Sequence, residues 1–389
     1  MGSSSHSQLI AENEHAQLFR HEGHSPFTLF TFNEMGMRAN GRQYWGQSLV
    51  EKNNLDAFAL VSRAPNWFPI STTVELLTNL NSSKEIITYG HSMGAYAALK
   101  FSRLLGASHA IAFCPQASIS PTDFGGKDKR YSSYFSQSLH GDMLLRSNDL
   151  AGRAHVIFDP MNSPDRMHAA AIADLGNVSL YPCRFTGHET IKILRSSADF
   201  LSLIEALRTN RENIAQSLLN NARKRSGIYL QHLATRLSHR RHHALALRMI
   251  SRIEGDEQYS VGVLTTSADI HLRMGDFAAS EVCAHELIER YPSRLNGYVV
   301  LGDALMGQMR WHEAAAAYLK ATTAAPNLGT GYACRALALD AAGDLDGVCA
   351  MVDAALSRDP ELRTISWERR KQVWALKKRA EAARVYPVS

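Results

Sequence analysis

Short apolar runs alternate with amphipathic stretches through the first half of the chain, up to about residue 207. Several runs hold five or six apolar residues in succession, which is typical of strands buried on both faces of a sheet. Helical periodicity at 72–80, 93–105 and 164–175 falls between such runs. This alternation predicts an α/β domain, in which helices cover both faces of a mostly parallel sheet. The predicted strands are 16–20, 27–33, 55–61, 86–90, 108–114, 153–159 and 178–184, and the first two are expected to pair as an edge hairpin.

From about residue 208 the strand pattern stops, and a helical pattern repeats every 34 residues. Each unit has small residues where two helices would cross closely, aromatic residues between them, and a proline that would end the second helix. Such units bury their apolar faces only by stacking on one another. The corresponding positions are Pro292, Pro326 and Pro360; Ala268, Gly302 and Ala336; and Leu264, Tyr298 and Tyr332.

This pattern resembles the tetratricopeptide repeat (TPR) over about residues 227–360, with three clear units and one degenerate leading unit. The resemblance implies an all-α domain of stacked helix pairs that docks a partner protein or carrier, or packs on the first domain as a scaffold. Residues 208–226 are expected to form a connecting helix, and residues 361–389 a capping helix and tail. Residues 1–15 are expected to form a flexible leader.

Composition narrows the function classes. The formal net charge of +5 on 389 residues falls short of the basic signature of nucleic-acid binding. The five cysteines are scattered and form no CxxC pair, so they are expected to be buried thiols in a reducing compartment. No stretch approaches the roughly 18 apolar residues of a membrane span, and the N-terminus lacks the apolar core of a signal peptide. The cytoplasm is therefore the expected location.

The stretch 85–101, EIITYGHSMGAYAALKF, carries the candidate nucleophile. Ser92 stands in a G-x-S-x-G pattern between a predicted strand and a predicted helix, which is the context of a nucleophile elbow. Glycines at positions 90 and 94 would let the strand and helix approach closely, and the first helical N–H, at Met93, would point to a developing oxyanion. The alternative is an ordinary turn serine between a buried strand and a buried helix.

A serine nucleophile needs a base, and the base needs an orienting acid. Asp159 ends the strand two after Ser92, and His188 follows the next strand, so all three are expected at one edge of the parallel sheet. Asp165 is the alternative acid, although its place near a helix start also suits an aspartate without a catalytic role. His168, on the same predicted helix, is expected on the surface.

The chain order Ser, Asp, His resembles that of the α/β-hydrolase family over about residues 16–207. The resemblance implies that Ser92 is the nucleophile, that His188 is the general base and acid, and that Asp159 orients it. It also implies an oxyanion hole built from the N–H of Met93 and a second donor in the loop after the strand 27–33. Family members often carry His-Gly in that loop, whereas this chain has Asn33-Glu34-Met35, so Glu34 and Met35 are the candidate donors.

Further residues near the same edge are candidates for binding substrate: Asn33, Tyr44, Trp45, Trp67 and Gln116, each of which could instead be a packing residue. Residues 116–150 form the longest polar insertion and stand where the family places its lid. Because this insertion is short, an open site is expected.

Together these features predict a serine hydrolase that cleaves a small or carrier-linked acyl ester or thioester through an acyl-enzyme, with no metal and no organic cofactor. Two alternatives remain at this stage. The first domain could be a catalytically inactive scaffold, or the same triad could transfer the acyl group to an acceptor other than water.

Overall fold

The computed structural model describes residues 7–78, 80, 82–255 and 260–385, with side chains to residue 379, and it comprises two compact units. The first unit runs to Tyr229 and the second begins at Leu230, so the division falls within the first turn of helix α8 (Gly227–His239), which we describe with the second unit. No helix in the described part of the chain has the length and apolar character needed to cross a membrane.

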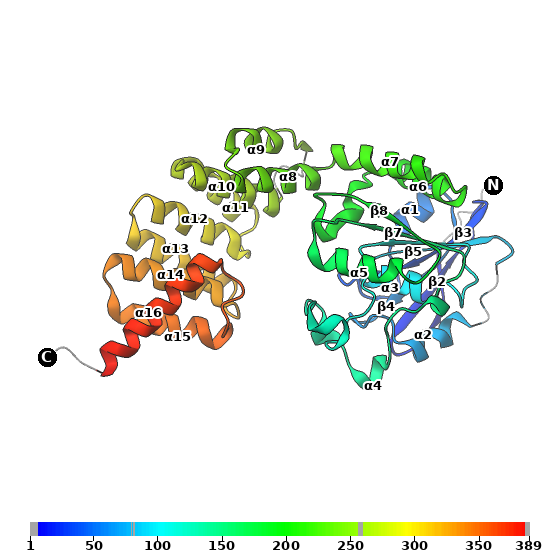
Figure 1. Ribbon diagram of the computed structural model, residues 1–389, viewed down its shortest axis with the longest axis horizontal. Helices are drawn as coiled ribbons and strands as arrows, with labels where there is room; N and C mark the ends of the chain where they lie inside the picture. The colour runs from blue at the N-terminus through cyan, green and yellow to red at the C-terminus, as the bar shows by residue number, and fades with distance from the viewer. Residues whose placement is uncertain (1–6, 79, 81, 256–259, 386–389) are drawn as a thin grey trace. The chain divides into compact units, whose positions relative to one another are not determined.

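The first unit is built on a mostly parallel sheet flanked by helices (Figure 1). Its eight strands lie in the order β1-β2-β4-β3-β5-β6-β7-β8. Strands β3 to β8 run parallel to one another, whereas β2 pairs antiparallel with both β1 and β4. The strands are β1 (Gln8–Glu12), β2 (Ala16–His21), β3 (Phe27–Phe32), β4 (Asp56–Ser62), β5 (Glu85–His91), β6 (His109–Phe113), β7 (Arg153–Phe158) and β8 (Val178–Pro182). The predicted α/β class and mostly parallel sheet are confirmed.

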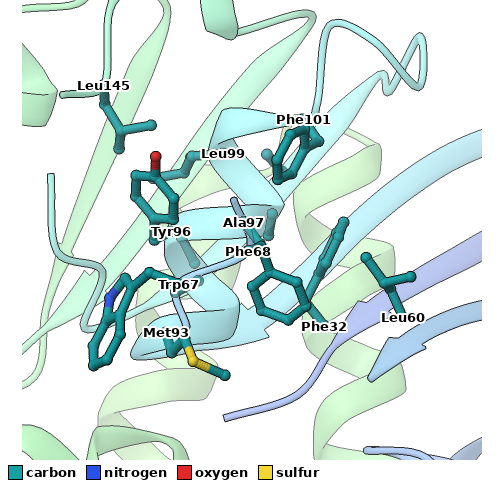
Figure 2. Packing of buried hydrophobic residues seen from close by; sticks show 14 of the residues in the cluster. Phe32, Leu60, Trp67, Phe68, Met93, Tyr96, Ala97, Leu99, Phe101 and Leu145 are labelled. Carbon is teal, nitrogen blue, oxygen red and sulfur yellow. The ribbon is translucent and has the colours of Figure 1, made fainter. Parts of the chain in front are cut away.

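Helices cover both faces of this sheet, as its continuous apolar strands predict. One face packs against α2 (Ile70–Leu77), α3 (Met93–Lys100) and α5 (Ser163–Ala173). The other packs against α1 (Gln47–Lys52), α6 (Ser197–Arg208) and α7 (Glu212–Arg225). On the first face, aromatic and aliphatic side chains surround α3, whose residues 93–99 are all buried (Figure 2). The helix that follows Ser92 is therefore held rigidly at the centre of the domain.

Two predictions for the N-terminal part of this domain are wrong. Strand β1 pairs with β2, so the predicted leader contributes residues 8–12 to the sheet, while residues 1–6 lie outside the described part. Strands 16–20 and 27–33 do not form a hairpin, because β4 lies between β2 and β3. The predicted connecting helix is α7, and it packs on the first domain through Ala215, Leu219 and Ala222.

The second unit consists of stacked TPR-like helix pairs, which confirms the predicted all-α class. Its helices are α8 (Gly227–His239), α9 (His243–Ile250), α10 (Val261–Met274), α11 (Phe277–Arg290), α12 (Leu295–Gly307), α13 (Trp311–Ala324), α14 (Gly329–Ala342), α15 (Leu345–Arg358) and the closing helix α16 (Trp367–Val385). Small residues do occupy the close crossings: a Cβ added to Gly302 would lie 2.3 Å from a ring carbon of Tyr318. The tail beyond Val385 lies outside the described residues.

Candidate active site

Ser92 occupies a sharp turn between β5 and α3. Its backbone has φ +52° and ψ −116°, a conformation that costs energy for a residue with a side chain and persists only where the surroundings enforce it. The flanking glycines allow that turn: a Cβ on Gly90 would lie 2.2 Å from the backbone of Gly94, and one on Gly94 would lie 2.2 Å from the Phe32 carbonyl oxygen. The strand, turn and helix predicted around Ser92 are thus present, with a structural reason for each glycine.

His188 lies beside Ser92 at the start of the 3-10 helix η4 (Gly187–Ile193), which follows β8. The distance from His188 Nε2 to Ser92 Oγ is 2.9 Å. On the other side of the ring, Nδ1 lies 3.0 Å and 2.9 Å from the two carboxylate oxygens of Asp165. A carboxylate only accepts, so Nδ1 carries the proton, and Nε2 is free to accept the Ser92 hydroxyl proton. Ser92, His188 and Asp165 are arranged as a nucleophile, a base and its orienting acid.

The structure therefore brings Asp165, the alternative acid of the sequence prediction, to His188, and not the favoured Asp159. The Asp159 carboxylate accepts N–H groups of Met161, Thr186 and Gly187 at 2.8 Å, 2.9 Å and 2.8 Å. This carboxylate ties the end of β7 to the loop that carries His188, so its role is structural. Asp165 reaches the histidine because α5 begins at Ser163 and holds Asp165 in its first turn, where the Asn162 side chain accepts the Asp165 N–H.

Asp165 is 1% exposed, and its carboxylate accepts hydrogen bonds from His188 Nδ1 and Arg130 Nη1. Burial alone would raise its pKa, but the His188 hydrogen bond and the Arg130 guanidinium together hold the pKa of Asp165 below its usual value. Arg130 Nη1 lies 3.0 Å from Asp165 Oδ1. The Asp165 carboxylate is thus ionised and shared between an imidazole and a guanidinium.

Gln116 and Trp67, two of the predicted substrate-binding residues, lie next to Ser92. Gln116 Nε2 is 3.4 Å from Ser92 Oγ and 3.1 Å from the Cys114 carbonyl oxygen. The Trp67 indole N–H donates to Gln116 Oε1 at 3.1 Å, which fixes the orientation of the amide. Both side chains are fully buried, so they pack around Ser92 and are not open to solvent.

The other predicted substrate-binding residues lie elsewhere or act within the fold. Tyr44 is buried in the core on the face of α6, and Trp45 packs on Tyr89 of that face with ring centroids 4.8 Å apart. The Asn33 amide is buried: its NH₂ donates to the carbonyl oxygens of Glu34 and Met37, and its oxygen accepts the Ser62 N–H. Asn33 therefore shapes the loop after β3.

The candidate oxyanion donors lie where the turn and the loop after β3 meet. Met93 is the first residue of α3, so its N–H has no partner one turn earlier in the helix. The loop runs against the same turn, because a Cβ on Gly94 would lie 2.9 Å from the Asn33 carbonyl oxygen. In that loop, the Glu34 carboxylate accepts the Gly36 N–H at 2.7 Å. Glu34 and Met35 remain candidates as backbone donors.

The insertion 116–150, which we call the covering segment, closes the site. Ser92 is only 5% exposed, so the expectation of an open site is wrong. Tyr131 of this segment places its hydroxyl 3.2 Å from His188 Nε2 and packs on Trp67 with ring centroids 4.9 Å apart. Burial raises the pKa of Tyr131, so its hydroxyl stays protonated and competes with Ser92 as a donor to Nε2.

Sequence reasoning also missed a second aspartate–histidine pair. His168 is 1% exposed, contrary to the expected surface position, and its Nε2 donates to Asp128 of the covering segment at 3.0 Å. Its Nδ1 accepts the Ala117 N–H at 3.2 Å. The polar residues DKRY at 128–131 were the available signal, but a chain position alone does not reveal which groups an insertion contacts.

Cys114, Asp165 and His188 offer ligand atoms within 4.8 Å of one another, the spacing of a metal site. One observation opposes that role. The Arg130 cation already contacts Asp165, where it would repel a metal ion.

Comparisons with known proteins bear on the repeats alone. No family model and no curated protein matches the chain. Among solved structures, the TPR2B domain of yeast Sti1, in a complex with pHsp70, matches at 24% identity over 31% of this chain and 96% of its own, with a TM-score of 0.29. A thermophilic TPR protein of Thermus thermophilus matches at 20% identity over 40% and 91%, with a TM-score of 0.33. MamA of Desulfovibrio magneticus RS-1 matches at 16% identity over 40% and 96%, with a TM-score of 0.31.

Proposed function

We propose that the first domain is a serine hydrolase of the α/β-hydrolase type. The observation that carries this proposal is the continuous hydrogen-bonded series from Ser92 Oγ through His188 to the buried Asp165 carboxylate. In the proposed mechanism, His188 Nε2 takes the Ser92 proton as Oγ attacks an acyl carbonyl, and the Met93 N–H stabilises the oxyanion. His188 then gives this proton to the leaving group, and water later releases the acyl group by the same steps in reverse order.

The substrate class that suits this site is a carboxylic ester or thioester, either small or attached to a carrier. Amide hydrolysis is the less favoured reaction, because an amine leaves less readily than an alcohol or thiol. A second candidate, acyl transfer to an acceptor other than water, is favoured by one observation: the covering segment leaves Ser92 only 5% exposed. Exclusion of water would prolong the acyl-enzyme until an acceptor arrives.

A fluorophosphonate probe tests the proposal, because it phosphonylates only an activated serine. We expect the native chain to gain one adduct, which peptide mapping locates on Ser92, and Ser92→Ala to remain unlabelled. Ser118, another buried serine at the same end of the sheet, supplies the matched control, and Ser118→Ala should label like the native chain. Absence of labelling in the folded native protein would contradict the hydrolase and favour an inactive scaffold.

We further propose that the helical repeats bind a protein partner. Helices α10, α12, α14 and α16 together line a cavity of about 810 Å³, in which acidic and basic side chains are mixed. The Sti1 structure was solved as a complex of its TPR2B domain with pHsp70, and this use of a TPR surface is the precedent for the proposal. Pull-down with the whole chain and with Asp269→Ala, in this cavity, tests it: a partner lost only in the variant supports repeat-mediated binding, and equal capture by both contradicts it.

A further inference from the structure

Arg130 of the covering segment contacts two carboxylates that belong to different parts of the site. Its Nη1 lies 3.0 Å from Asp165 Oδ1, and its Nε lies 3.0 Å from both carboxylate oxygens of Asp128. Its Nη2 lies 2.7 Å from Asp128 Oδ2. The guanidinium therefore joins the triad acid to an aspartate of its own segment.

Asp128 is in turn fixed to the body of the domain. It accepts the His168 Nε2 proton at 3.0 Å, and His168 lies one turn after Asp165 on α5. Residues three apart on a helix lie on the same side, so α5 presents both contacts to the covering segment. The segment is thus held at two adjacent points, and one of them is the carboxylate that orients the candidate base.

We propose that Arg130 is a positioning residue of the triad: it shares Asp165 Oδ1 with His188 and so balances part of the carboxylate charge that would otherwise favour the protonated ring. This inference rests on the proposed function, because it assigns a role to Arg130 through Asp165 and His188.

The shared oxygen gives the argument its physical basis. Arg130 Nη1 and His188 Nδ1 each lie 3.0 Å from Asp165 Oδ1, so the guanidinium nitrogen is within about 6 Å of the imidazole. Part of the carboxylate charge is balanced by the guanidinium, so less of it stabilises a protonated His188. If the guanidinium is removed by mutation, Asp165 faces His188 alone, and the imidazolium becomes more favourable.

Other groups around His188 do not replace this effect. His91 lies beside the ring and donates to the His188 carbonyl oxygen, and burial lowers the pKa of His91, so it adds no positive charge. Glu189 on the same element pairs with Lys192 at 2.9 Å. In the described part of the chain, the remaining groups that face His188 are neutral: the hydroxyls of Ser92 and Tyr131 and the Cys114 thiol. The Glu34 carboxylate interacts electrostatically with His91.

The test compares Arg130→Met and Arg130→Lys with Lys129→Met, which removes an exposed charge from the neighbouring position. Two readouts are measured against pH in the full-length chain: the rate constant of fluorophosphonate labelling, and the NMR signal of the His188 ring, assigned with His188→Ala. We expect the midpoint of both to rise by about 0.5–1 pH unit in Arg130→Met, as loss of a nearby screened charge predicts. Arg130→Lys should restore most of the native profile, and Lys129→Met should not move it.

A structural role alone would lower the labelling rate or the melting temperature and leave the midpoints unchanged, and that result in folded Arg130→Met would overturn the inference. Arg130→Gln, which keeps polar contacts without the charge, is the second variant. Failure of both neutral variants to fold, while Lys129→Met folds, would assign Arg130 to folding and would also overturn it. If the native protein is not labelled at all, the proposed function fails, yet the His188 NMR midpoint still decides whether Arg130 acts on His188.

Discussion

Helix α5 contributes one residue to each of two aspartate–histidine pairs, and the two pairs use the imidazole ring in opposite ways. In the first, Asp165 accepts from His188 Nδ1, and Nε2 faces the Ser92 hydroxyl. In the second, Asp128 accepts from His168 Nε2, and Nδ1 accepts a backbone N–H. The lone pair on His188 Nε2 can therefore accept the hydroxyl proton of Ser92. In His168, by contrast, both ring nitrogens are hydrogen-bonded to structural partners. An Asp–His contact therefore defines a base only when the second nitrogen faces a reactive group.

The largest expected effect separates the two histidines. His188→Ala should lower the rate constant of fluorophosphonate labelling by about 10³–10⁴-fold, because Ser92 loses its base, with little change in melting temperature. His168→Ala should instead cost about 2–3 kcal/mol of stability, because Asp128 and the Ala117 N–H lose a buried partner. Labelling rates of the folded proteins and their thermal melts give both quantities. Equal losses of rate in the two variants would contradict the division of roles.

A buried histidine on β7 extends the comparison to pH. Burial, with smaller contributions from the neighbouring His109 and Arg153 charges, lowers the pKa of His155 to about 3. The unfolded chain takes up a proton below about pH 6.5, but the folded site does so only near pH 3, so stability is lost as pH falls through this window. At pH 5 the loss amounts to about 2 kcal/mol. Between about pH 7.5 and pH 5, the melting temperature of His155→Phe should therefore fall less than that of the native chain. An equal fall in both proteins would contradict the lowered pKa of His155.

The helical repeats differ from the first domain, whose candidate site lies at the carboxyl ends of parallel strands, because close helix packing dominates their structure. Gly302→Ala forces a methyl group against the buried Tyr318 ring, from which a Cβ would be only 2.3 Å away. We expect it to destabilise the helical unit by about 1–3 kcal/mol in urea unfolding followed by circular dichroism. The labelling rate of Ser92 under native conditions should not change. A slower rate in the folded variant would show that the repeats influence the site.

The smallest effect concerns the covering segment. Tyr131→Phe removes the hydroxyl that competes with Ser92 for His188 Nε2, so the labelling rate should rise about threefold, the value of one modest hydrogen bond. The reaction is followed under pseudo-first-order conditions with excess probe. A slower reaction would mean that this hydroxyl assists the chemistry, for example by stabilising the oxyanion.

The sequence was sufficient to predict the parts of the molecule that depend on local patterns. Continuous apolar runs indicate the buried strands, and prolines and small residues at a period of 34 indicate the repeat. Gly90, Ser92 and Gly94 carry their own context, because a strand precedes them and a helix follows. Edge pairing was mispredicted, because proximity in the chain favoured a hairpin, whereas β4 inserts between β2 and β3.

The choice between two acids could not be made from the sequence, because it depends on where backbone N–H groups point after folding. Asp159 directly follows β7, but its carboxylate oxygens accept hydrogen bonds from three backbone N–H groups. Asp165 is six residues further along the chain, yet the start of α5 returns it to His188. The contacts of the covering segment could not be predicted either: its position and short length predicted a lid over an open site, whereas Asp128 and Arg130 pair with groups from α5.

The most direct test of the proposed triad is the rate constant of fluorophosphonate labelling in Asp165→Asn and Asp159→Asn, measured side by side on folded protein. Asp165→Asn should lower it by about 10³–10⁴-fold, because His188 loses its orienting charge and its tautomer. Asp159→Asn should lower the melting temperature, since an amide NH₂ replaces an acceptor of buried N–H groups, and should keep the rate within about tenfold of the native value. The reverse order, with the larger loss of rate in Asp159→Asn, would contradict the assignment of Asp165 as the acid.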